Sequence, residues 1–349
     1  MLCFSLSSGL RANSYVGCLC SFRIDLDQDR DDGPEYDQIH LSHLCKWAKL
    51  GAQAMTIDAV LRLLAVMVLW AACFPLITIG LDLAPHIAFA AMRAALAGIC
   101  LIALGILCGR SIPAGSRSWG LIVVVGLGAT SMGFLGMFHA AEFVSPGLAT
   151  VIANVQPIIA AVLAHLLLGE RLKATGKIGL AVGLAGIAVI ALPSLAADHS
   201  QGYSLGIAYV VIAATGVSVG NVAIKRLTGK VDPIMAMGFQ LLIGAVPLAL
   251  LSMVTEDVSL LTWSTEFVLV LVALSVFGSS RAFWLWFEAL ERVSLNRANA
   301  FTFLVPIFGL MIGAAFFGER LKVAQVAGVV LVLAGIVLVQ RDAASSRRG

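Results

Sequence analysis

The chain has 349 residues, of which 60% are hydrophobic and only 12% are charged, and its mean hydropathy of +0.96 is far above that of a soluble domain. Its net charge of +3 is too small to indicate nucleic acid as a partner. Long apolar segments separated by short charged loops predict instead an all-α membrane protein that crosses a lipid bilayer.

The first segment, residues 1–56, does not share this pattern. It carries an acidic run over 25–37 and is too weakly apolar to bury a core, so we expect a disordered tail, or an upstream extension that is not translated, with Met55 as the start. It is also unlike a signal or transit peptide. It contains a group of possible metal ligands, which are Cys18, Cys20, His40, His43 and Cys45. Their spacings match no common zinc pattern, so we predict no metal site.

Ten later stretches have the length of a spanning helix, about 20 residues each. In chain order they are 59–80, 85–108, 119–139, 147–168, 177–194, 205–224, 233–254, 266–287, 297–317 and 323–340. The short connections predict a compact bundle. Frequent Gly and Ala residues predict close helix–helix packing, because lipid offers no hydrophobic driving force.

The second half of these stretches repeats the first. The segment 144–192 recurs at 293–341, so that Pro157 aligns with Pro306 and the motif GERLK occurs twice. Two homologous halves are typical of secondary transporters, whose substrate site lies between the repeats. We therefore divide the chain into the tail 1–56, a first repeat at 57–194, a second repeat at 205–340 and a basic tail at 341–349.

Basic residues lie almost only in alternate loops. Those after even-numbered spans and in the C-terminal tail are Arg110, Arg117, Arg171, Lys173, Lys177, Lys225, Arg226, Lys230, Arg292, Arg297, Arg341, Arg347 and Arg348, whereas the other loops carry Arg320 and Lys322. Because cytoplasmic loops are enriched in Lys and Arg, both termini are predicted to be cytoplasmic. Five spans per half is an odd number, so the two repeats are predicted to be inverted.

Several motifs resemble the drug/metabolite transporter superfamily, EamA type. They are WAACFPLITIGL in the first span, AAMRAAL around Arg93, the two GERLK motifs and WLWFEALERVSLNRANAFTFLVPIFG. The resemblance covers about residues 57–340. It implies ten helices in two inverted five-helix repeats, usually in the bacterial inner membrane, that export or exchange small metabolites, often amino acids. The family's frequent Asn in the first span is here Cys73, whereas the second half keeps an amide, Asn221, at the comparable place.

Two arginines lie at membrane depth, where a charge is costly and tends to line a cavity. The guanidinium of Arg93 or Arg281 can bind a substrate carboxylate through two parallel hydrogen bonds. The repeat partner of Arg281 is Met132, so the shared fold does not require this charge. The alternatives are a structural Arg that snorkels or binds backbone carbonyls, or an ion pair between Arg281 and Glu288.

The fourth and ninth spans are predicted to kink at Pro157 and Pro306, because Pro frees a carbonyl one turn earlier. Asn154 and Gln156 precede the first kink, whereas Phe303 precedes the second. We therefore predict a cavity between the halves with amides from one side and aromatic rings from the other. The remaining candidates for its lining are Asn221 and an apolar wall of Trp70, Phe74, Trp284 and Trp286, although such rings also occur at lipid-facing positions.

Two further features have competing interpretations. Glu288 near the end of the eighth span is a candidate for exchanging a coupling proton, or else a carboxylate solvated at the interface. The GERLK motifs are interpreted as structural corners, in which Gly169 ends a helix and the basic residues interact with its carbonyls, or as a gating ion pair.

These features together predict a secondary transporter of small-molecule substrates, with amino acids or related carboxylates as the expected cargo and multidrug or cationic compound efflux as the alternative. No metalloprotease motif or other catalytic cluster lies in the spans, so we expect no enzyme and no cofactor. No ring of charges or repeated filter sequence indicates an ion channel.

The predicted topology is tested by reporter fusions at Gly349. Green fluorescent protein fused there should fluoresce and alkaline phosphatase should be inactive, because the basic loops hold this end in the cytoplasm. Active phosphatase at this position would contradict the inverted five-plus-five arrangement.

Overall fold

The computed structural model describes residues 55–140, 152–195, 203–316 and 323–345, together with positions 143 and 149. The segment 1–54, with its possible metal ligands, lies outside the described residues. The second GERLK motif also lies outside them.

The described elements are all helical. Those of the first repeat are α3 (Ile57–Leu81), α4 (His86–Leu107), α5 (Ser116–Val125), the π-helical segment η1 (Gly126–Met132), α6 (Gly133–Ala140), α8 (Gln156–Leu168) and α9 (Ala174–Leu195). Those of the second repeat are α10 (Tyr203–Leu227), α11 (Pro233–Thr255), the 3₁₀ turn η2 (Val258–Leu260), α12 (Thr265–Ala273), the π-helical segment η3 (Leu274–Arg281), α13 (Ala282–Arg292), α14 (Leu295–Phe301), α15 (Leu304–Phe316) and α16 (Val323–Ser345).

Helix ends follow local capping rules. The Asp232 carboxylate accepts from the backbone N–H groups at the start of α11, and the Ser264 hydroxyl accepts from the Phe267 N–H at 3.0 Å at the start of α12. Gly169 ends α8 with a positive φ of 70°, a conformation that glycine adopts without steric cost.

Among the described residues, nine helical stretches are long and apolar enough to cross a bilayer. The third and eighth are continuous through their π segments, as Ser116–Ala140 and Thr265–Arg292. The fourth predicted span is represented by the shorter helix α8, of 13 residues. The predicted fold class, an all-α membrane protein of two inverted repeats, is confirmed.

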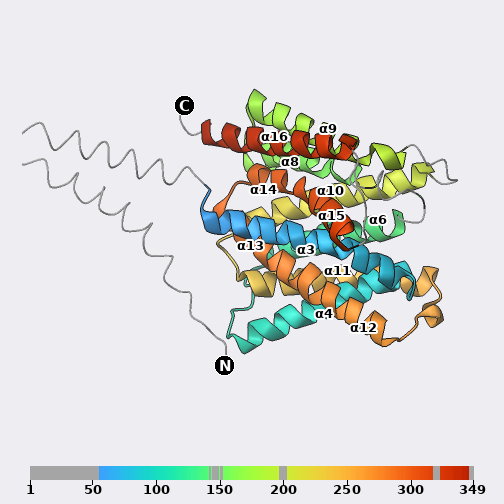
Figure 1. The fold of residues 1–349 in the computed structure, drawn as a ribbon. Helices are drawn as coiled ribbons and strands as arrows, with labels where there is room; N and C mark the ends of the chain where they lie inside the picture. Colours follow the sequence, from blue (N-terminus) through green and yellow to red (C-terminus); the bar gives the residue numbers. More distant parts are fainter. Residues whose placement is uncertain are drawn as a thin grey trace, which may run out of the picture. The chain divides into compact units, whose positions relative to one another are not determined.

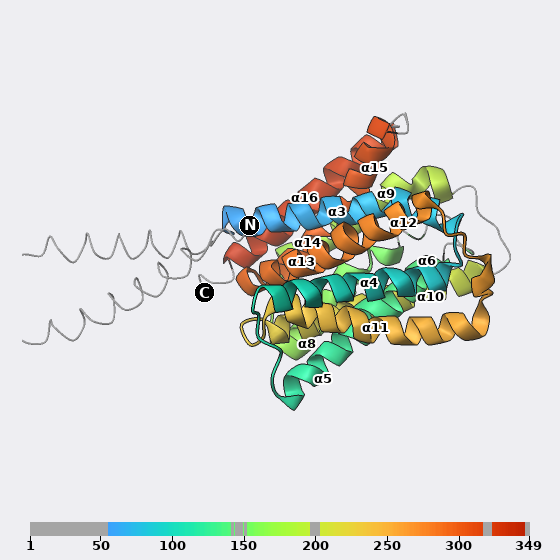
Figure 2. The same ribbon diagram turned by 90° about the horizontal axis from the view of Figure 1, so that it is seen from below.

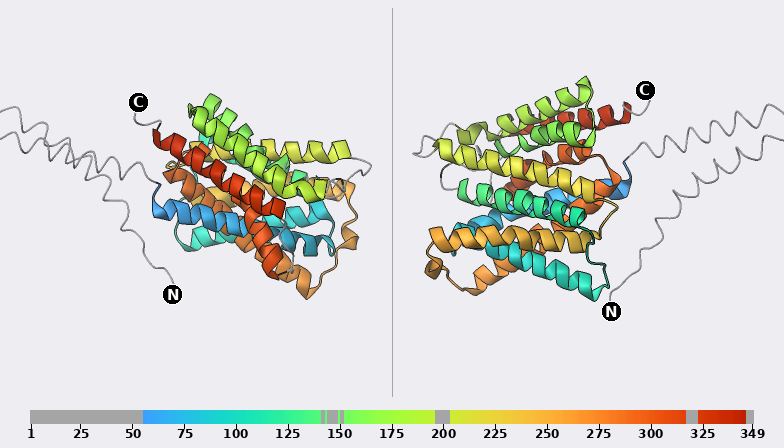
Figure 3. Two further views of the ribbon diagram at one scale, coloured as in Figure 1. Left: turned by 45° about the horizontal axis from the view of Figure 1, so that its top comes forward. Right: turned by 180° about the vertical axis from the view of Figure 1, so that it is seen from behind.

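The helices form two walls, and each wall includes one helix from the other repeat. In the first wall, α10 packs beside α5, η1, α6 and α8; in the second wall, α3 packs beside α12, η3, α13 and α15, with α14 leading into α15. Figure 2 shows the two walls on opposite sides of the bundle, and Figure 3 (right) shows α10 running beside the α5–η1–α6 helix. Each wall therefore contains helices from both repeats.

Two helix pairs close the edges of the bundle. The α9–α16 pair lies at one edge and the α4–α11 pair at the other, each with one helix from each repeat (Figure 1). Small residues set the approach within these pairs. A Cβ on Gly335 of α16 would lie only 2.6 Å from the carbonyl oxygen of Gly179 on α9. Such contacts replace the missing hydrophobic driving force with close backbone packing.

The two π segments occupy equivalent places in the repeats. Met132 and Arg281 end them, 149 residues apart. In η1 the Ser131 hydroxyl donates to the Gly244 carbonyl of α11 at 2.8 Å, and in η3 the Ser280 hydroxyl donates to the Ala97 carbonyl of α4 at 2.9 Å. Each hydroxyl also bonds the carbonyl five residues earlier. A π turn thus joins each wall to an edge pair.

Replacing Gly335 by Ala should lower the midpoint of thermal unfolding in detergent. The added methyl group overpacks the α9–α16 contact, a change that typically costs about 1–3 kcal/mol. Gly309 in α15 is the matched control, since a Cβ there meets nothing within 4 Å. Gly309→Ala should be neutral or stabilise by up to about 1 kcal/mol through helix propensity. Equal effects of the two substitutions would contradict the packing account.

Candidate functional site

We call the end of the bundle where α3 begins and α16 ends the basic end (Figure 1, left). The described basic residues of its loops and helix ends are Arg110, Arg117, Arg171, Lys173, Lys177, Lys225, Arg226, Lys230, Arg292, Arg297 and Arg341. The candidate site lies between the two walls, a short way in from this end.

A buried amide cluster joins the two walls. The side-chain oxygen of Asn299 on α14 accepts from Gln156 Nε2 of α8 and from Asn221 Nδ2 of α10, both at 3.2 Å. The indole Nε1 of Trp286 on α13 donates to Asn221 Oδ1 at 2.9 Å. The Ser218 hydroxyl donates to the Gln156 carbonyl at 3.1 Å. We call these five residues the amide cluster.

The amide cluster closes the basic end of the space between the walls. Its side chains are almost fully buried, with exposed fractions from 0% for Trp286 to 7% for Gln156. The more extensive contacts between the described parts of the two walls are all made by α8, α10, α13 and α14, the helices that carry the cluster. One donor of the cluster, Asn299 Nδ2, is buried without a partner. It is therefore positioned to donate to a ligand oxygen.

A second layer of contacts lies nearer the basic end. The Lys225 ammonium donates to the carbonyls of Val293, at 2.7 Å, and Leu290, at the end of α13. The Glu170 carboxylate accepts from the N–H groups of Leu295 and Asn296, at 2.9 and 3.1 Å, at the start of α14. A cation at a helix C-terminus and a carboxylate at a helix N-terminus both complement the helix dipole.

This layer gives the first GERLK motif a defined role. Glu170 follows Gly169, which ends α8, and it caps a helix of the other repeat. Gly169 thus ends a helix, as interpreted from the sequence, and Glu170 links the two halves.

The opposite end contains a different set of polar contacts. Glu256 accepts from the N–H groups of Ile87 and Ala88, both at 2.8 Å, at the start of α4. The His86 ring lies between this carboxylate, at 3.2 Å, and the His139 ring, at 2.7 Å between Nε2 and Nδ1. These contacts join α4 to α11 and α6 and do not link the two walls.

Arg281 is placed away from the amide cluster. Its guanidinium is exposed and lies over the Trp284 ring, 4.5 Å from the ring centroid. Trp286, five residues further on, points into the amide cluster, and five residues turn an α-helix by about 140° beyond a full turn. Arg281 therefore points well away from Gln156 and Asn154, in contrast to the predicted grouping.

The alternative of an ion pair between Arg281 and Glu288 is not found among the described residues. Glu288 pairs instead with Arg62 of α3, which also bonds Asp58 at 3.0 Å. Asp58 in turn pairs with Arg292 at 3.1 Å. The cause is the packing of α13 on α3, which brings an arginine 226 residues away in sequence to the carboxylate.

Arg93 is buried at the junction of three helices. Its Nε donates to the Ser279 hydroxyl at 2.9 Å, and its terminal nitrogen contacts the Cys73 sulfur at 3.5 Å. The Phe134 ring lies 4.8 Å from the guanidinium carbon. In the related place of the other half, the Thr130 hydroxyl donates to the Gln240 side chain at 2.8 Å. Arg93 thus supplies a cation where the other half has a neutral amide.

The predicted aromatic lining is only partly assembled. Trp70 packs against Trp286, with ring centroids 5.4 Å apart, and so borders the amide cluster. Phe74 is 43% exposed on the same helix, and Trp284 lies under Arg281. Phe303 is fully buried, and its ring would meet a Cβ on Gly183 of α9 at 2.8 Å, so it packs against the α9–α16 edge.

The two predicted kinks are breaks in the helices. Asn154 and Val155 form a turn directly before α8, whose second residue is Pro157. A turn at residues 302–303 separates α14 from α15, whose third residue is Pro306.

Sequence reasoning missed Asn299 and Ser218. Both are polar residues within apolar spans, so the same criterion that selected Asn221 also applies to them. Trp286 was expected only as an apolar wall, and the structure shows its N–H bonded to Asn221. Amides therefore come from both halves of the chain.

Comparison with known proteins agrees with this architecture. The model of the EamA-like transporter family matches residues 58–192 and 204–341, one match for each repeat. A chloroplastic WAT1-related protein of Arabidopsis thaliana is 32% identical over 72% of this chain, which spans 61% of that relative's length. A "probable amino-acid metabolite efflux pump" of Salmonella typhimurium is 28% identical over 80% of this chain and 94% of its own length. A solved crystal structure superposes with a TM-score of 0.68 at 22% identity, over 80% of this chain and 95% of that one.

Two inverted repeats with a polar cluster between two walls define a multi-pass membrane protein with the architecture of a transporter. The chain belongs to the EamA-like transporter family.

Replacing Trp286 by Phe should lower thermal stability by about 1–3 kcal/mol, because it keeps an aromatic ring but leaves Asn221 Oδ1 buried without a donor. Trp263→Phe, at a site that is 67% exposed, makes the same chemical change outside the cluster and should have little effect. The measurement is thermal unfolding of the purified protein in detergent. If Asn221→Leu is added, the loss should be less than additive, as expected for residues in contact.

Proposed function

We propose that this protein is a secondary transporter that exports or exchanges small polar metabolites across the bacterial inner membrane by alternating access. In this proposal the basic end is cytoplasmic and both termini lie on that side. The exchange of one helix between the walls supports it, because two walls built from inverted repeats can rock about a site between them.

The observation that carries the proposal is a difference in burial between two repeat-related positions. Trp286 of the amide cluster is fully buried, whereas its repeat partner Met137, near the opposite end of its wall, is 44% exposed. In an inverted repeat these two positions face the same central space from opposite ends. We infer that the space is closed at the basic end and open at the other, which is an outward-facing state.

The substrate class follows from the donors that surround this space. Asn299 has a buried N–H without an acceptor, and Arg93 is a buried cation that bonds only neutral groups among the described residues. Both suit a substrate with an oxygen acceptor such as a carboxylate. The name of the Salmonella relative supports amino acids and related carboxylates. We assign the recognition of this group to Asn299 and Arg93 rather than to Arg281, which points elsewhere.

Glu288 is the proposed site of a coupling proton. Its carboxylate holds Arg62 of α3 against α13, so protonation would release the contact between two helices of the second wall. Proton binding would in this way be linked to the packing that transport must change. Glu288→Gln should abolish the pH dependence of transport. A retained pH dependence would contradict the proposal that Glu288 binds the coupling proton.

The proposal is tested with purified protein in lipid vesicles and a panel of radiolabelled amino acids, other carboxylates and cationic dyes. We expect exchange of at least one carboxylate-bearing compound and no transport of the dyes. Asn299→Ala should weaken the apparent affinity by roughly tenfold or more, since a donor to the substrate is lost.

Gln240→Met is the matched control, because it removes a fully buried amide outside the amide cluster. It should leave the apparent affinity close to that of the wild type. Transport of dyes but not of carboxylates would favour the alternative, a pump for cationic compounds. Equal effects of the two amide substitutions would contradict recognition by the cluster.

A further inference from the structure

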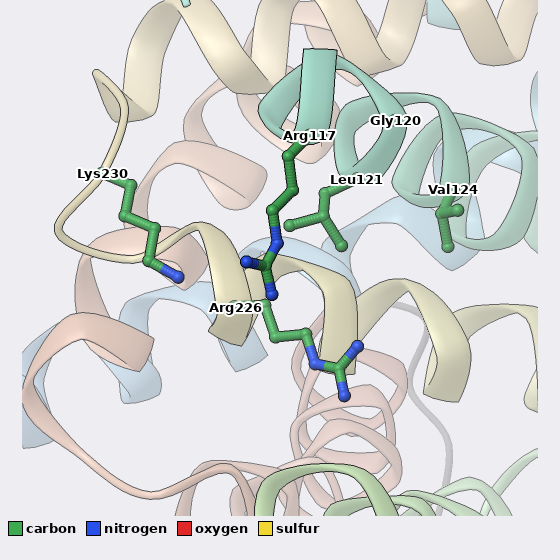
Figure 4. Close-up of a pocket in the computed structure, with 6 residues that line it drawn as sticks. All are labelled: Arg117, Gly120, Leu121, Val124, Arg226 and Lys230. Carbon is green, nitrogen blue, oxygen red and sulfur yellow. The ribbon is translucent and has the colours of Figure 1, made fainter. Parts of the chain in front are cut away.

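A pocket on the outer surface of the first wall has no part in the proposed transport path. It has a volume of about 450 Å³ and lies at the basic end, between the start of α5 and the end of α10. Its lining residues are Arg117, Gly120, Leu121, Val124, Arg226 and Lys230 (Figure 4).

The direction of the α10 side chains places the pocket outside the walls. Asn221 points into the amide cluster, and Arg226, five residues further on, lies about 140° away around the helix. Arg226 is exposed, as are the apolar residues Ile212 on α10 and Leu127 on η1, further from the basic end. The pocket therefore opens on the apolar surface that faces lipid.

The charges of the pocket are of one sign. Arg117, Arg226 and Lys230 all line it (Figure 4), and among the described residues none of the three forms an ion pair with an acidic side chain. The Arg226 guanidinium is oriented by a hydrogen bond to the Leu167 carbonyl at 2.8 Å. Three uncompensated cations favour an anion with several oxygen acceptors, such as a phosphate.

The pocket is open beside Gly120. A Cβ on Gly120 would meet nothing within 4 Å, so no packing contact requires glycine at this helical position. In a helix interior glycine costs up to about 1 kcal/mol relative to Ala. The missing side chain leaves room above Val124, where the lining changes from charged to apolar along α5.

We propose that this pocket binds the phosphate headgroup of an acidic phospholipid, with its acyl chains along the apolar face of α5 and α10. A basic pocket between membrane helices at the level of the headgroups suits such a lipid. The bound headgroup connects α5 to the end of α10 and so braces the first wall. The assignment of this lipid to the cytoplasmic side rests on the orientation proposed above. The binding of the lipid to the purified protein does not depend on that orientation.

The test is native mass spectrometry of the full-length protein in detergent, titrated with phosphatidylglycerol or with zwitterionic phosphatidylcholine. The wild type should retain phosphatidylglycerol preferentially, and this lipid should raise its unfolding temperature. Arg117→Gln combined with Arg226→Gln should weaken retention by roughly twenty-fivefold, at about fivefold for each cation removed. Gly120→Leu should weaken it as strongly while it keeps all three charges, because the side chain fills the pocket.

The control variant combines Arg171→Gln and Lys177→Gln, which removes two exposed charges at the same end but outside the pocket. It should retain phosphatidylglycerol within about twofold of the wild type, since its pocket is intact. An equal loss in the control, or full retention by Gly120→Leu, would contradict lipid binding in the pocket and indicate attraction to the general surface charge instead. Displacement of the lipid by excess inorganic phosphate would assign the site to a soluble phosphate instead. None of these outcomes depends on whether the vesicles show transport.

Discussion

Inside a bilayer a polar group that loses its partner has no water to replace it, and this constraint explains most of the local features of the structure. Where η1 and η3 interrupt regular α-helical bonding, Ser131 and Ser280 bond both their own helix and the neighbouring edge pair. Where α8 and α14 begin, groups from the other half or from the preceding turn bond the backbone groups of the first helical turn. Glu170 does this for the N–H groups of α14. The interruptions of the helices are therefore also the places where the two repeats are joined.

The same constraint makes the two ends of the bundle unequal. At the basic end, amides from both repeats satisfy each other, and Lys225 and Glu170 bond the ends of α13 and α14. These contacts must break together if that end is to open, and each broken contact leaves a polar group to be solvated by entering water or by substrate. In the proposed mechanism, a substrate oxygen that accepts from the unpartnered N–H of Asn299 compensates for part of this loss.

The roles of the two arginines show how far sequence reasoning reaches. Both were identified as charges at membrane depth, because that follows from their position in an apolar span. Their partners did not follow from it: Arg93 bonds Ser279, 186 residues away, and Arg281 stacks on Trp284 while Glu288 pairs with Arg62. In a transporter with an inverted repeat, the second copy adds a useful check, since Gln240 marks the place of Arg93 as polar in both halves.

The sequence by itself determined the fold class, the doubled five-helix plan and the inversion of the repeats, because these depend on composition, segment length and a constant offset between motifs. It also identified Gln156 and Asn221 as polar residues near the centre. Only the tertiary structure decided that Gln156 and Asn221 both bond Asn299, which lies 143 residues from the first and 78 residues from the second. It also decided that Phe303 and Arg281 point elsewhere. The physical reason is that side-chain direction depends on how each helix is rotated against its neighbours, and helices that are apolar on every side carry little periodic signal of that rotation.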